Sequence, residues 1–418
     1  MKIALLNTYR VIQGRGGAEK VFCELANGFA QCGHEVLALA YDEAEGRPFY
    51  PLDSRVIFMN TWSGRNVLLS VVEKVKTFSF SKEIRRDRRR KLQQRKLFID
   101  RTEKVVLAIR EFSPDVILSF QISSSGYIKD GVGDIPVVTM LHGHPDFYEI
   151  EEEQKDILRK SRRVQVLLPQ YEAIFKAKFS KDPPEVVCIH NSVPVYKELS
   201  DGMGKKILHI GRIAPEKRQH LLVEAFSLLQ KDFPDWTLEL WGERSDLEYD
   251  RFVCDVIRKC GMNPDSVLKG VSSNVENILK SGSIFVFPSS VEGFPLALTE
   301  AMSMGLCCVG CCDCLSVSTL VKDDYSGILT QPNGKDLAEA IKKAMTTPSM
   351  RINFGRNASS DMKKYSKERV VEEWISLFEE LGKLFKNPCS QAELNKIVPF
   401  GFSLQRQKMV FFFAIKIV

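Results

Sequence analysis

The stretch FPSSVEGFPLALTEAMSMG, residues Phe287 to Gly305, places two glutamates eight residues apart. Glu292 lies in a Gly-Pro loop, and Glu300 lies in the apolar segment that follows it. The apolar run that ends at Pro288 predicts a buried strand, and Pro295 suits the first turn of a helix. Because ligands of open parallel sheets bind where loops leave the carboxyl ends of strands, this turn is a candidate ligand site.

The groups on this turn suit a sugar nucleotide. The free backbone N–H groups of Gly293 and Phe294 are expected to point into the crevice, where a helix start favours phosphate. Glu300 lies about two helical turns further along, so a carboxylate stands at each end of the phosphate position. Carboxylates accept hydrogen bonds from vicinal hydroxyls, which a nucleoside diphosphate sugar carries on both sides of its phosphates. The simpler alternative is a solvated loop glutamate followed by a helix-surface glutamate.

The rest of the chain alternates strand-like and helix-like segments, which predicts an α/β fold with parallel sheets. With 418 residues the chain is long enough for two domains. There are two series of strand-like segments, and each is long enough for a Rossmann-like layer. The first series contains residues 2–7, 35–41, 115–120, 136–142, 163–169 and 185–191, and the second contains 205–211, 237–242, 266–271, 283–289 and 306–311.

The boundary between the two layers is predicted in residues 191–206, where Gly, Ser and Asp accumulate. We therefore expect a first domain over residues 1–195 and a second over 196–366. Residues 367–386 form a strongly amphipathic segment that predicts a helix. The tail, residues 387–418, ends in the apolar run MVFFFAIKIV, which is too short to span a bilayer. That run fits a docked strand, a membrane-surface contact or a disordered tail.

The composition is that of an ordinary soluble protein, with 44% hydrophobic and 27% charged residues. No segment has the roughly 20 apolar residues of a membrane-spanning helix, and the first residues, MKIALLNT, suit a buried strand better than a signal peptide. The eleven cysteines lack disulfide-scaffold spacing, which indicates reduced thiols in a cytoplasm. The overlapping C-x-x-C spacings of CCVGCCDC, Cys307 to Cys314, fall on a predicted buried strand, where cysteine is a small hydrophobe rather than a zinc ligand.

Two further segments place cations and glycines near predicted strand ends. ILHIGRIAPEKRQHLL puts Arg212 and Lys217 between a strand and a helix. Arg offers a fork of donors and Lys a point charge, so the two could neutralise a diphosphate, although such residues more often form surface ion pairs. GRGGAEKV carries Gly16 and Gly17 after the first strand, where glycine lets the backbone approach a phosphate closely. This loop lacks the G-x-G-x-x-G spacing of dinucleotide binding.

Together, these segments resemble the family-4 retaining glycosyltransferases of the GT-B fold. The matching segments are GGAEKVF, GRIAPEKRQHLLVEAF, VFPSSVEGFPLALTEAMSMG and SGILTQPNGKDLAEAI. The resemblance runs from Met1 to about Phe385, and the E-x7-E element of Glu292 and Glu300 is its most specific part. It implies two Rossmann-like domains that face across a cleft, with the acceptor mainly on the first and the donor on the second. It also implies that the helix of residues 367–386 crosses back to the first domain.

The resemblance implies roles for individual residues. Arg212 and Lys217 match the pair that holds the donor diphosphate. Glu292 matches the glutamate at the donor sugar, and Glu300 matches the glutamate at the ribose. The other donor-binding matches are Gly16, Gly17, Val271, Gly293 and Phe294.

A histidine after a strand of the first domain, His142, matches the family's histidine near the reacting sugar. His144 lies two residues away and is the other candidate for this match, and the simpler role of either is that of a satisfied strand-end residue. The expected catalytic residues are His142, Arg212, Lys217 and Glu292. One departure is visible after Asp313 and Cys314, where the family has a Gly-Pro-x-Glu segment and this chain has LSVSTLV.

Retention normally calls for a carboxylate nucleophile, and the family offers no clear one. The resemblance implies instead a front-face reaction in which the leaving diphosphate helps to take the acceptor proton. Arg212, Lys217 and the helix start are expected to stabilise the charge that develops on that diphosphate. Because cations fill this role and no D-x-D cluster suits Mg²⁺, we expect neither a cofactor nor a metal.

The leading interpretation is a hexosyltransferase that moves a sugar from a UDP- or GDP-sugar to a glycan or lipid-linked acceptor. The pathway expected is the assembly of bacterial envelope polysaccharide, lipopolysaccharide or capsule. One alternative is a GT-B enzyme that transfers no sugar, such as a sugar-nucleotide epimerase. Another is a catalytically silent sugar-nucleotide-binding subunit, but such a subunit is expected to have lost the matched Arg, Lys or Glu residues, and all are present.

The excess positive charge lies in one segment, Lys82 to Lys96, which carries nine basic and two acidic residues and so a charge of +7, against +6 for the whole chain. Such a segment suits an anionic membrane surface, and we expect a peripheral protein on the inner face of the cytoplasmic membrane. A solvated helix face is the common alternative, and no nucleic-acid recognition motif accompanies the segment. The interleaved apolar residues are Phe78, Phe80, Ile84, Leu92 and Leu97, and the expected membrane contacts are Arg85, Arg86, Arg88, Arg89 and Arg90.

Overall fold

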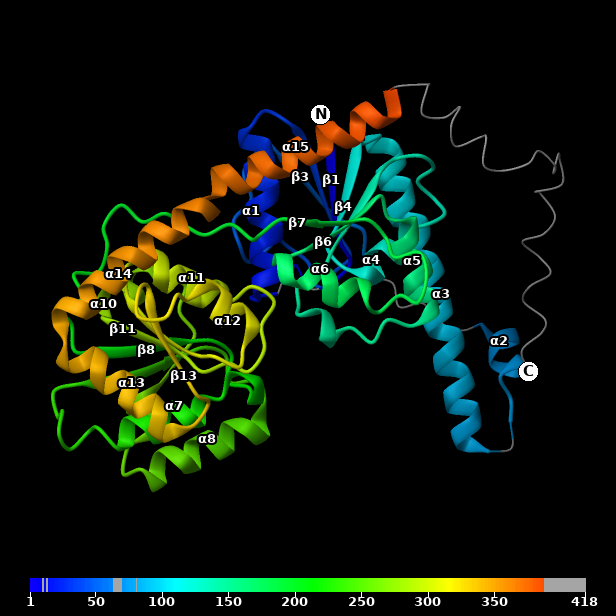
Figure 1. The fold of residues 1–418 in the computed structure, drawn as a ribbon. Helices are drawn as coiled ribbons and strands as arrows, with labels where there is room; N and C mark the ends of the chain where they lie inside the picture. Colours follow the sequence, from blue (N-terminus) through cyan, green and yellow to red (C-terminus); the bar gives the residue numbers. More distant parts are fainter. Residues whose placement is uncertain (10, 13, 63–69, 80, 387–418) are drawn as a thin grey trace. The chain divides into compact units, whose positions relative to one another are not determined.

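The computed structural model describes residues 1–386 except residues 10, 13, 63–69 and 80. The predicted tail at 387–418, with its apolar run at 409–418, and Phe80, which precedes the basic segment, therefore lie outside the described residues. Backbone contacts divide the chain into two compact units, Met1–Trp374 and Ile375–Val418. The first unit contains two parallel β-sheets flanked by helices (Figure 1), so the predicted α/β class is confirmed.

Seven parallel strands form the first sheet: β1 (Lys2–Asn7), β2 (Glu35–Ala40), β3 (Val56–Asn60), β4 (Val116–Ser119), β5 (Val137–Met140), β6 (Arg163–Val166) and β7 (Val186–Cys188). Their order is β3-β2-β1-β4-β5-β6-β7, with β1 paired to β2 and β4. Residues 3–6 of β1 are fully buried, because a central parallel strand is covered on both faces. The edge strand β3 was not predicted, since its exposed Ile57 and Met59 interrupt any continuous buried run.

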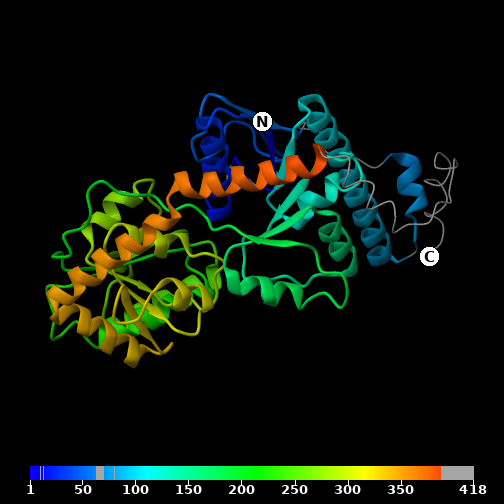
Figure 2. The same ribbon diagram turned by 45° about the horizontal axis from the view of Figure 1, so that its top comes forward.

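The helices of the first sheet are α1 (Gly17–Gln31), α2 (Val71–Lys76), α3 (Lys82–Phe112), α4 (Ile122–Ile128), α5 (Glu152–Lys160) and α6 (Pro169–Lys176), with a 3-10 turn η1 (Pro145–Phe147). The longest, α3, has 31 residues, but its buried residues lie only between Val105 and Ile109. The first half of α3, which carries the basic segment, extends beyond the sheet with α2 beside it (Figures 1 and 2). Much of the positive charge is therefore outside the core.

Six parallel strands form the second sheet: β8 (Lys206–Ile210), β9 (Thr237–Trp241), β10 (Leu268–Gly270), β11 (Ile284–Phe287), β12 (Cys307–Cys311) and β13 (Gly327–Thr330). Their order is β10-β9-β8-β11-β12-β13. The first strand of the series, β8, thus has β9 on one side and β11 on the other, so the strand order reverses beside it. A crevice for ligands is expected at the carboxyl ends of β8 and β11.

The second sheet is accompanied by η2 (Pro215–Lys217), α7 (Gln219–Ser227), α8 (Leu247–Lys259), α9 (Pro264–Val267), α10 (Val275–Ser281), α11 (Leu296–Ser303), α12 (Leu315–Leu320), α13 (Gly334–Thr346) and α14 (Pro348–Met362). The 3-10 turn η3 (Lys363–Tyr365) and α15 (Lys367–Lys386) follow. At the start of α15, Lys367 Nζ donates to Gln31 Oε1 at 2.9 Å, and Val371 packs against Gly28 of α1. That this helix as a whole crosses back to the first domain stays a prediction.

One apolar cluster contains buried residues of both sheets, among them Leu141 and Phe175 from the first and Leu208 and Phe287 from the second. The two sheets of the first unit therefore share a core at their junction. The predicted domain limits, 1–195 and 196–366, stay a prediction. Among the described helices, none combines the length and the apolar character required to cross a bilayer.

Candidate functional site

Glu292 and Lys217 form an ion pair at the carboxyl end of the second sheet. Glu292 lies between β11 and α11, Lys217 ends η2 after β8, and Lys217 Nζ donates to Glu292 Oε1. The two side chains are only 14% and 13% exposed, for Lys217 and Glu292 respectively. The structure thus brings together two predicted site residues that lie 75 positions apart.

Two buried residues that were not predicted hold the turn after β8. His209 Nδ1 lies 2.9 Å from Val286 O, and Gln219 Nε2 lies 3.3 Å from His209 Nε2 and donates to Arg212 O at 2.7 Å. Since an amide nitrogen only donates, His209 is neutral with its proton on Nδ1. Burial agrees with this state because it lowers the pKa of His209 to about 4. A histidine within the apolar strand KILHI was the only sequence signal for this support.

Glu216 joins the turn after β8 to the loop after β11. Its carbonyl oxygen accepts from Ser290 N at 2.8 Å and from Ser290 Oγ at 3.1 Å, and its carboxylate accepts from the Arg212 guanidinium at 3.2 Å. Arg212 is 61% exposed, far more than Lys217. The structure therefore pairs Lys217 with Glu292 and places the second predicted cation, Arg212, at the solvent-facing side of the same turn.

Glu300 pairs with a lysine of the first domain. Lys20 Nζ on α1 donates to Glu300 Oε1, and it also lies 3.8 Å from Glu24 Oε1. Ser192 Oγ donates to the other oxygen of Glu24 at 3.0 Å. Burial by itself lowers the pKa of Lys20, but the carboxylates of Glu300 and Glu24 outweigh it and raise that pKa above its ordinary value. Lys20 was not predicted as a site residue, although it lies in the segment GGAEKVF.

Two predicted glycines make close approaches to the other domain. A Cβ on Gly17 would lie 3.0 Å from Leu296 Cδ1 of α11. A Cβ on Gly293 would overlap the carbonyl oxygen of His142 and lie 2.9 Å from Gly143 Cα. Glycine is therefore required at Gly293 by the neighbouring backbone. Gly16, also predicted, is the N-cap of α1 and approaches only the Glu19 carboxylate, and Phe294 places its ring in the core, 5.6 Å from the Tyr365 ring.

His142 lies at the end of β5 with its ring stacked on Phe120 at 5.1 Å. Burial lowers the pKa of His142 to about 4, and the nearby backbone of Phe120 offsets this only in part. Neither ring nitrogen meets the geometry of a hydrogen bond to any described residue. His142 is thus a neutral imidazole with unpaired nitrogens, which can donate or accept toward a ligand.

His144, the other histidine of this segment, supports the local structure. Its Nδ1 accepts from Asp146 N at 3.2 Å, and its ring packs edge-on against Tyr171 at 4.9 Å. Tyr171, on α6, donates its hydroxyl proton to Glu292 O at 2.7 Å. Tyr171 was not predicted, yet this first-domain residue holds the loop that carries Glu292.

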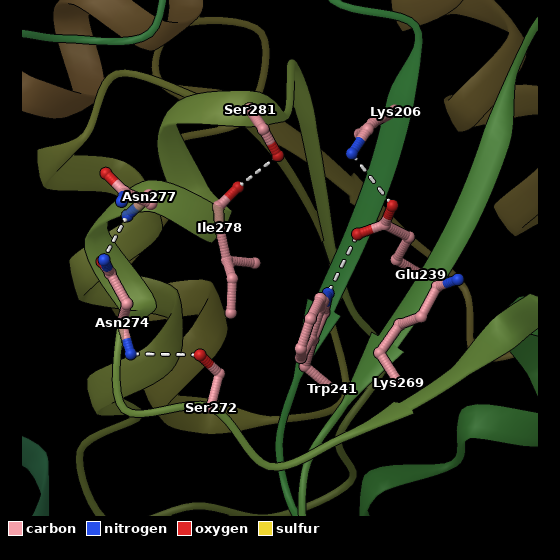
Figure 3. Close-up of a pocket in the computed structure, with 9 residues that line it drawn as sticks. All are labelled: Lys206, Glu239, Trp241, Lys269, Ser272, Asn274, Asn277, Ile278 and Ser281. Carbon is pink, nitrogen blue, oxygen red and sulfur yellow. Dashed lines mark hydrogen bonds and ion pairs between the residues drawn. The ribbon is translucent and has the colours of Figure 1, made fainter.

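Val271 follows β10 and is 51% exposed. The next residue, Ser272, lines a hollow of about 450 Å³ beside β9 and α10 (Figure 3). Within it, Trp241 Nε1 donates to Glu239 Oε2 at 3.0 Å, and Lys206 Nζ lies 3.0 Å from Glu239 Oε1. The predicted donor contact at Val271 therefore adjoins a polar hollow with one aromatic ring.

The segment that departs from the family forms the whole of α12. Asp313 Oδ2 accepts from Arg218 at 2.7 Å, which ties this segment to the turn after η2. Burial raises the pKa of Cys307 and of Cys311 to about 12, so both thiols stay neutral. Within the described part of the chain, no three His, Cys, Asp or Glu side chains gather closely enough to hold a metal ion.

The basic segment lies in the first half of α3, which packs against α2. Residues 70–79 and 81–99 together form a helical hairpin, here called the basic hairpin. Lys96 Nζ lies 2.7 Å from Glu73 Oε2, and Arg89 Nε donates to Thr77 Oγ1 at 3.4 Å, so α2 is held against α3. Arg86, Arg88 and Arg90 are exposed, and Arg85 and Arg89 are half-buried. Large apolar side chains are also exposed on the hairpin, namely Val72, Val75, Phe78 and Ile84.

Two parallel sheets in one chain, each flanked by helices, are typical of the GT-B class of glycosyltransferases. Residues 196–361 match the family model described as glycosyl transferases group 1, and residues 15–197 match the model described as glycosyltransferase family 4. The two matches together run from residue 15 to residue 361. The chain belongs to this family of glycosyltransferases.

Three relatives illustrate the range of the family. An exopolysaccharide phosphotransferase of Streptomyces coelicolor is 24% identical over 68% of this chain, which spans 31% of that protein's length. An uncharacterized glycosyltransferase of Haemophilus influenzae is 22% identical over 87% of this chain and 96% of its own length. A poly(ribitol-phosphate) alpha-N-acetylglucosaminyltransferase of Staphylococcus aureus is 26% identical over 47% of this chain and 40% of its own length. The chain thus spans less than half of two of these relatives.

Solved structures of the same architecture cover nearly the whole chain. Sucrose-phosphate synthase from Thermosynechococcus elongatus has a TM-score of 0.72 at 17% identity, over 91% of this chain and 98% of that one. HepE of Anabaena in complex with UDP and glucose has a TM-score of 0.69 at 16% identity, over 91% of this chain and all of that one. At these identities the likeness establishes the GT-B fold alone.

Proposed function

We propose that this enzyme is a retaining hexosyltransferase that takes its sugar from a UDP- or GDP-sugar. The observation that carries the proposal is the Lys217–Glu292 ion pair at the carboxyl ends of β8 and β11. In this pair, Lys217 is a cation that can bind phosphate, and Glu292 is a carboxylate that can accept hydrogen bonds from sugar hydroxyls. The pair lies where the strand order of the second sheet reverses. The complex of HepE with UDP and glucose supports a nucleoside diphosphate donor.

The remaining donor contacts surround this pair. The backbone of Gly293 and Phe294 leads into α11, whose start favours a diphosphate, and Arg212 adds a second cation from the solvent-facing side. Glu300 on the same helix is the proposed ribose contact. Because Tyr171 and the backbone of His142 both contact the Glu292 loop, the first domain helps to hold the donor end in shape.

In the proposed reaction, the bond between the anomeric carbon and the β-phosphate oxygen breaks while the acceptor oxygen bonds to the same face of that carbon. The acceptor proton passes to the leaving phosphate oxygen. Lys217, Arg212 and the start of α11 stabilise the charge on the diphosphate, so neither a cofactor nor a metal ion is needed. His142, whose pKa is lowered by burial, is the residue proposed to hold a hydroxyl of the reacting sugar.

The acceptor proposed is a glycan or a lipid-linked glycan of the bacterial envelope, such as a capsule or lipopolysaccharide precursor. The name of the Staphylococcus relative, which acts on poly(ribitol-phosphate), supports an envelope polymer. The basic hairpin supports a peripheral position on the cytoplasmic face of the membrane, since exposed arginines and apolar side chains occur together on it.

Thermal unfolding in the presence of UDP, GDP and their sugars tests the donor assignment. A ligand that binds only the folded state raises the unfolding temperature by mass action, so we expect protection by at least one nucleoside diphosphate. The Lys217→Ala variant should show a smaller shift with the same nucleotide. If no nucleotide stabilises the wild-type enzyme, the proposed donor class is wrong. Labelled sugar nucleotides incubated with bacterial membranes then separate glycosyl transfer from simple binding.

A further inference from the structure

Each glutamate of the E-x7-E element is paired with a lysine, but the two lysines belong to different domains. Lys217, the partner of Glu292, follows a strand of the second sheet. Lys20, the partner of Glu300, lies in the second turn of α1 beside the first sheet. Both pairs lie within the compact unit Met1–Trp374. The contact of Lys20 therefore makes the ribose end of the donor site depend on a first-domain residue.

We propose that Lys20 is a positioning residue that fixes the Glu300 carboxylate for the ribose hydroxyls of the donor. The inference rests on the proposed function, because it takes Glu300 to be the ribose contact. A carboxylate has two oxygens and about four lone-pair directions. Lys20 engages Oε1 of Glu300, which leaves Oε2 to accept hydrogen bonds from a vicinal diol.

The electrostatics around Glu300 make Lys20 necessary for this geometry. Glu300 is only 8% exposed. Burial raises the pKa of Glu24, and the nearby negative charge of Glu300 raises it further. Lys20 contacts both carboxylates, whereas Lys367, the other lysine of this cluster, acts on Glu24. Without the charge of Lys20, Glu300 faces a like charge in a poorly hydrated place, and its carboxylate loses the contact that fixes its orientation. A carboxylate that turns away no longer accepts hydrogen bonds from the ribose hydroxyls.

The backbone around Lys20 gives the pair little freedom. Three residues before it, Gly17 packs against Leu296 in the first turn of α11, the helix that carries Glu300. The start of α1 and the start of α11 are therefore in direct contact, and the lysine and the glutamate extend from these two helices. A shift of the glycine loop at Gly16 and Gly17 would therefore move α11 and the Glu300 carboxylate that it carries.

Isothermal titration with UDP and 2′-deoxy-UDP, and in parallel with GDP and 2′-deoxy-GDP, tests the inference on the full chain. Loss of one hydroxyl bonded to a carboxylate should weaken binding by about tenfold or more in the wild type. For Lys20→Met, we expect the affinity for the ribonucleotide to fall by about tenfold. The ratio of the affinities for the ribonucleotide and the 2′-deoxyribonucleotide should then approach one. Lys20→Arg should restore most of that preference. The matched control is Lys104→Met, since Lys104 has a similar exposure, 29% against 27%, and an ion pair with Asp100 at 2.7 Å.

The outcomes separate the inference from the proposed function. A wild-type enzyme that binds no nucleoside diphosphate overturns both. A wild-type enzyme that prefers ribose, together with a Lys20→Met variant that keeps the same preference or binds more tightly, overturns only the role of Lys20. Loss of affinity without loss of the ribose preference also contradicts the role of Lys20, because a merely structural role weakens both nucleotides alike. A Lys20→Arg variant as impaired as Lys20→Met contradicts it as well, since arginine keeps the positive charge.

Discussion

The donor end of the second sheet and the basic hairpin of the first domain both concentrate charge, but they hold it in opposite ways. At the donor end, Lys217, Glu292 and Glu300 are each less than 15% exposed and each has a charged partner. On the hairpin, Arg86, Arg88 and Arg90 are exposed, and of these only Arg90 has an acidic partner at hydrogen-bond distance among the described residues, Asp87 at 3.0 Å.

This difference indicates different kinds of recognition. Shielded and paired charges keep one geometry, and their interactions are strong because little water screens them. Exposed charges interact through solvent, so their effect reaches about one Debye length, adds over several residues and weakens with salt. The donor end is thus suited to one ligand in one orientation, and the hairpin to an extended anionic surface.

The largest expected effect is at the donor end. Lys217→Ala and Glu292→Ala should each lower kcat by about 1000-fold, because each removes a group that acts on developing charge or on the donor sugar in a shielded site. Transfer of labelled sugar measures the loss, and circular dichroism should show an unchanged fold. Lys205→Ala is the control, since its pair with Asp235 at 2.9 Å is mostly exposed. Near-normal turnover in either site variant would show that its assigned role is wrong.

The hairpin should show a smaller effect on membrane binding and a strong dependence on salt. Wild-type protein is expected to sediment with vesicles that contain anionic lipid at low salt and to be released at high salt. Changing Arg85, Arg86, Arg88, Arg89 and Arg90 to Gln should weaken this binding by about 100-fold, since each arginine near such a surface contributes up to about 1 kcal/mol. Equal binding by the two proteins, or binding by neither, contradicts the membrane role.

A further effect concerns pH and His142, whose ring nitrogens are buried and whose backbone lies against Gly293 of the donor end. Its pKa is lowered to about 4, so between pH 6.5 and pH 4 the unfolded chain takes up a proton that the native protein does not. This histidine should therefore cost about 2 kcal/mol of stability between pH 7.5 and pH 5.

Urea unfolding of wild type and His142→Phe at the two pH values measures this cost. The other buried histidines titrate in both proteins and cancel in the difference. The variant should gain stability relative to wild type as the pH falls, whereas a difference independent of pH would mean that His142 titrates normally in the native state.

The smallest expected effect is that of metal removal. Because Lys217, Arg212 and the start of α11 supply the positive charge at the diphosphate, transfer activity after treatment with EDTA should be unchanged. Restoration of a lost activity by Mg²⁺ or Mn²⁺ after such treatment would contradict the proposed absence of a metal. The vesicle assay should be equally unaffected by EDTA, which keeps the two regions distinct.

Much of the fold and part of the site followed from local sequence patterns. Continuous apolar runs predict buried parallel strands, and the loop chemistry around Glu292 and Lys217 predicts the turn at which they meet. The edge strand β3 was missed because two of its five side chains face solvent. The assignment of His142 rested on resemblance alone, and the structure adds its burial and its unpaired nitrogens.

The amino-acid sequence by itself determined the α/β class, the strand-to-helix turn at Glu292 and the position of the excess positive charge, because these depend on periodicity, turn residues and composition within short windows. The tertiary structure alone decided the partners: Lys20 with Glu300 across 280 positions, and Tyr171 with the carbonyl of Glu292 across 121. It also decided that the donor-end charges are shielded while the hairpin arginines are largely exposed. The physical reason is that burial and pairing depend on which segments pack together, and no local pattern in the chain encodes a neighbour so far away.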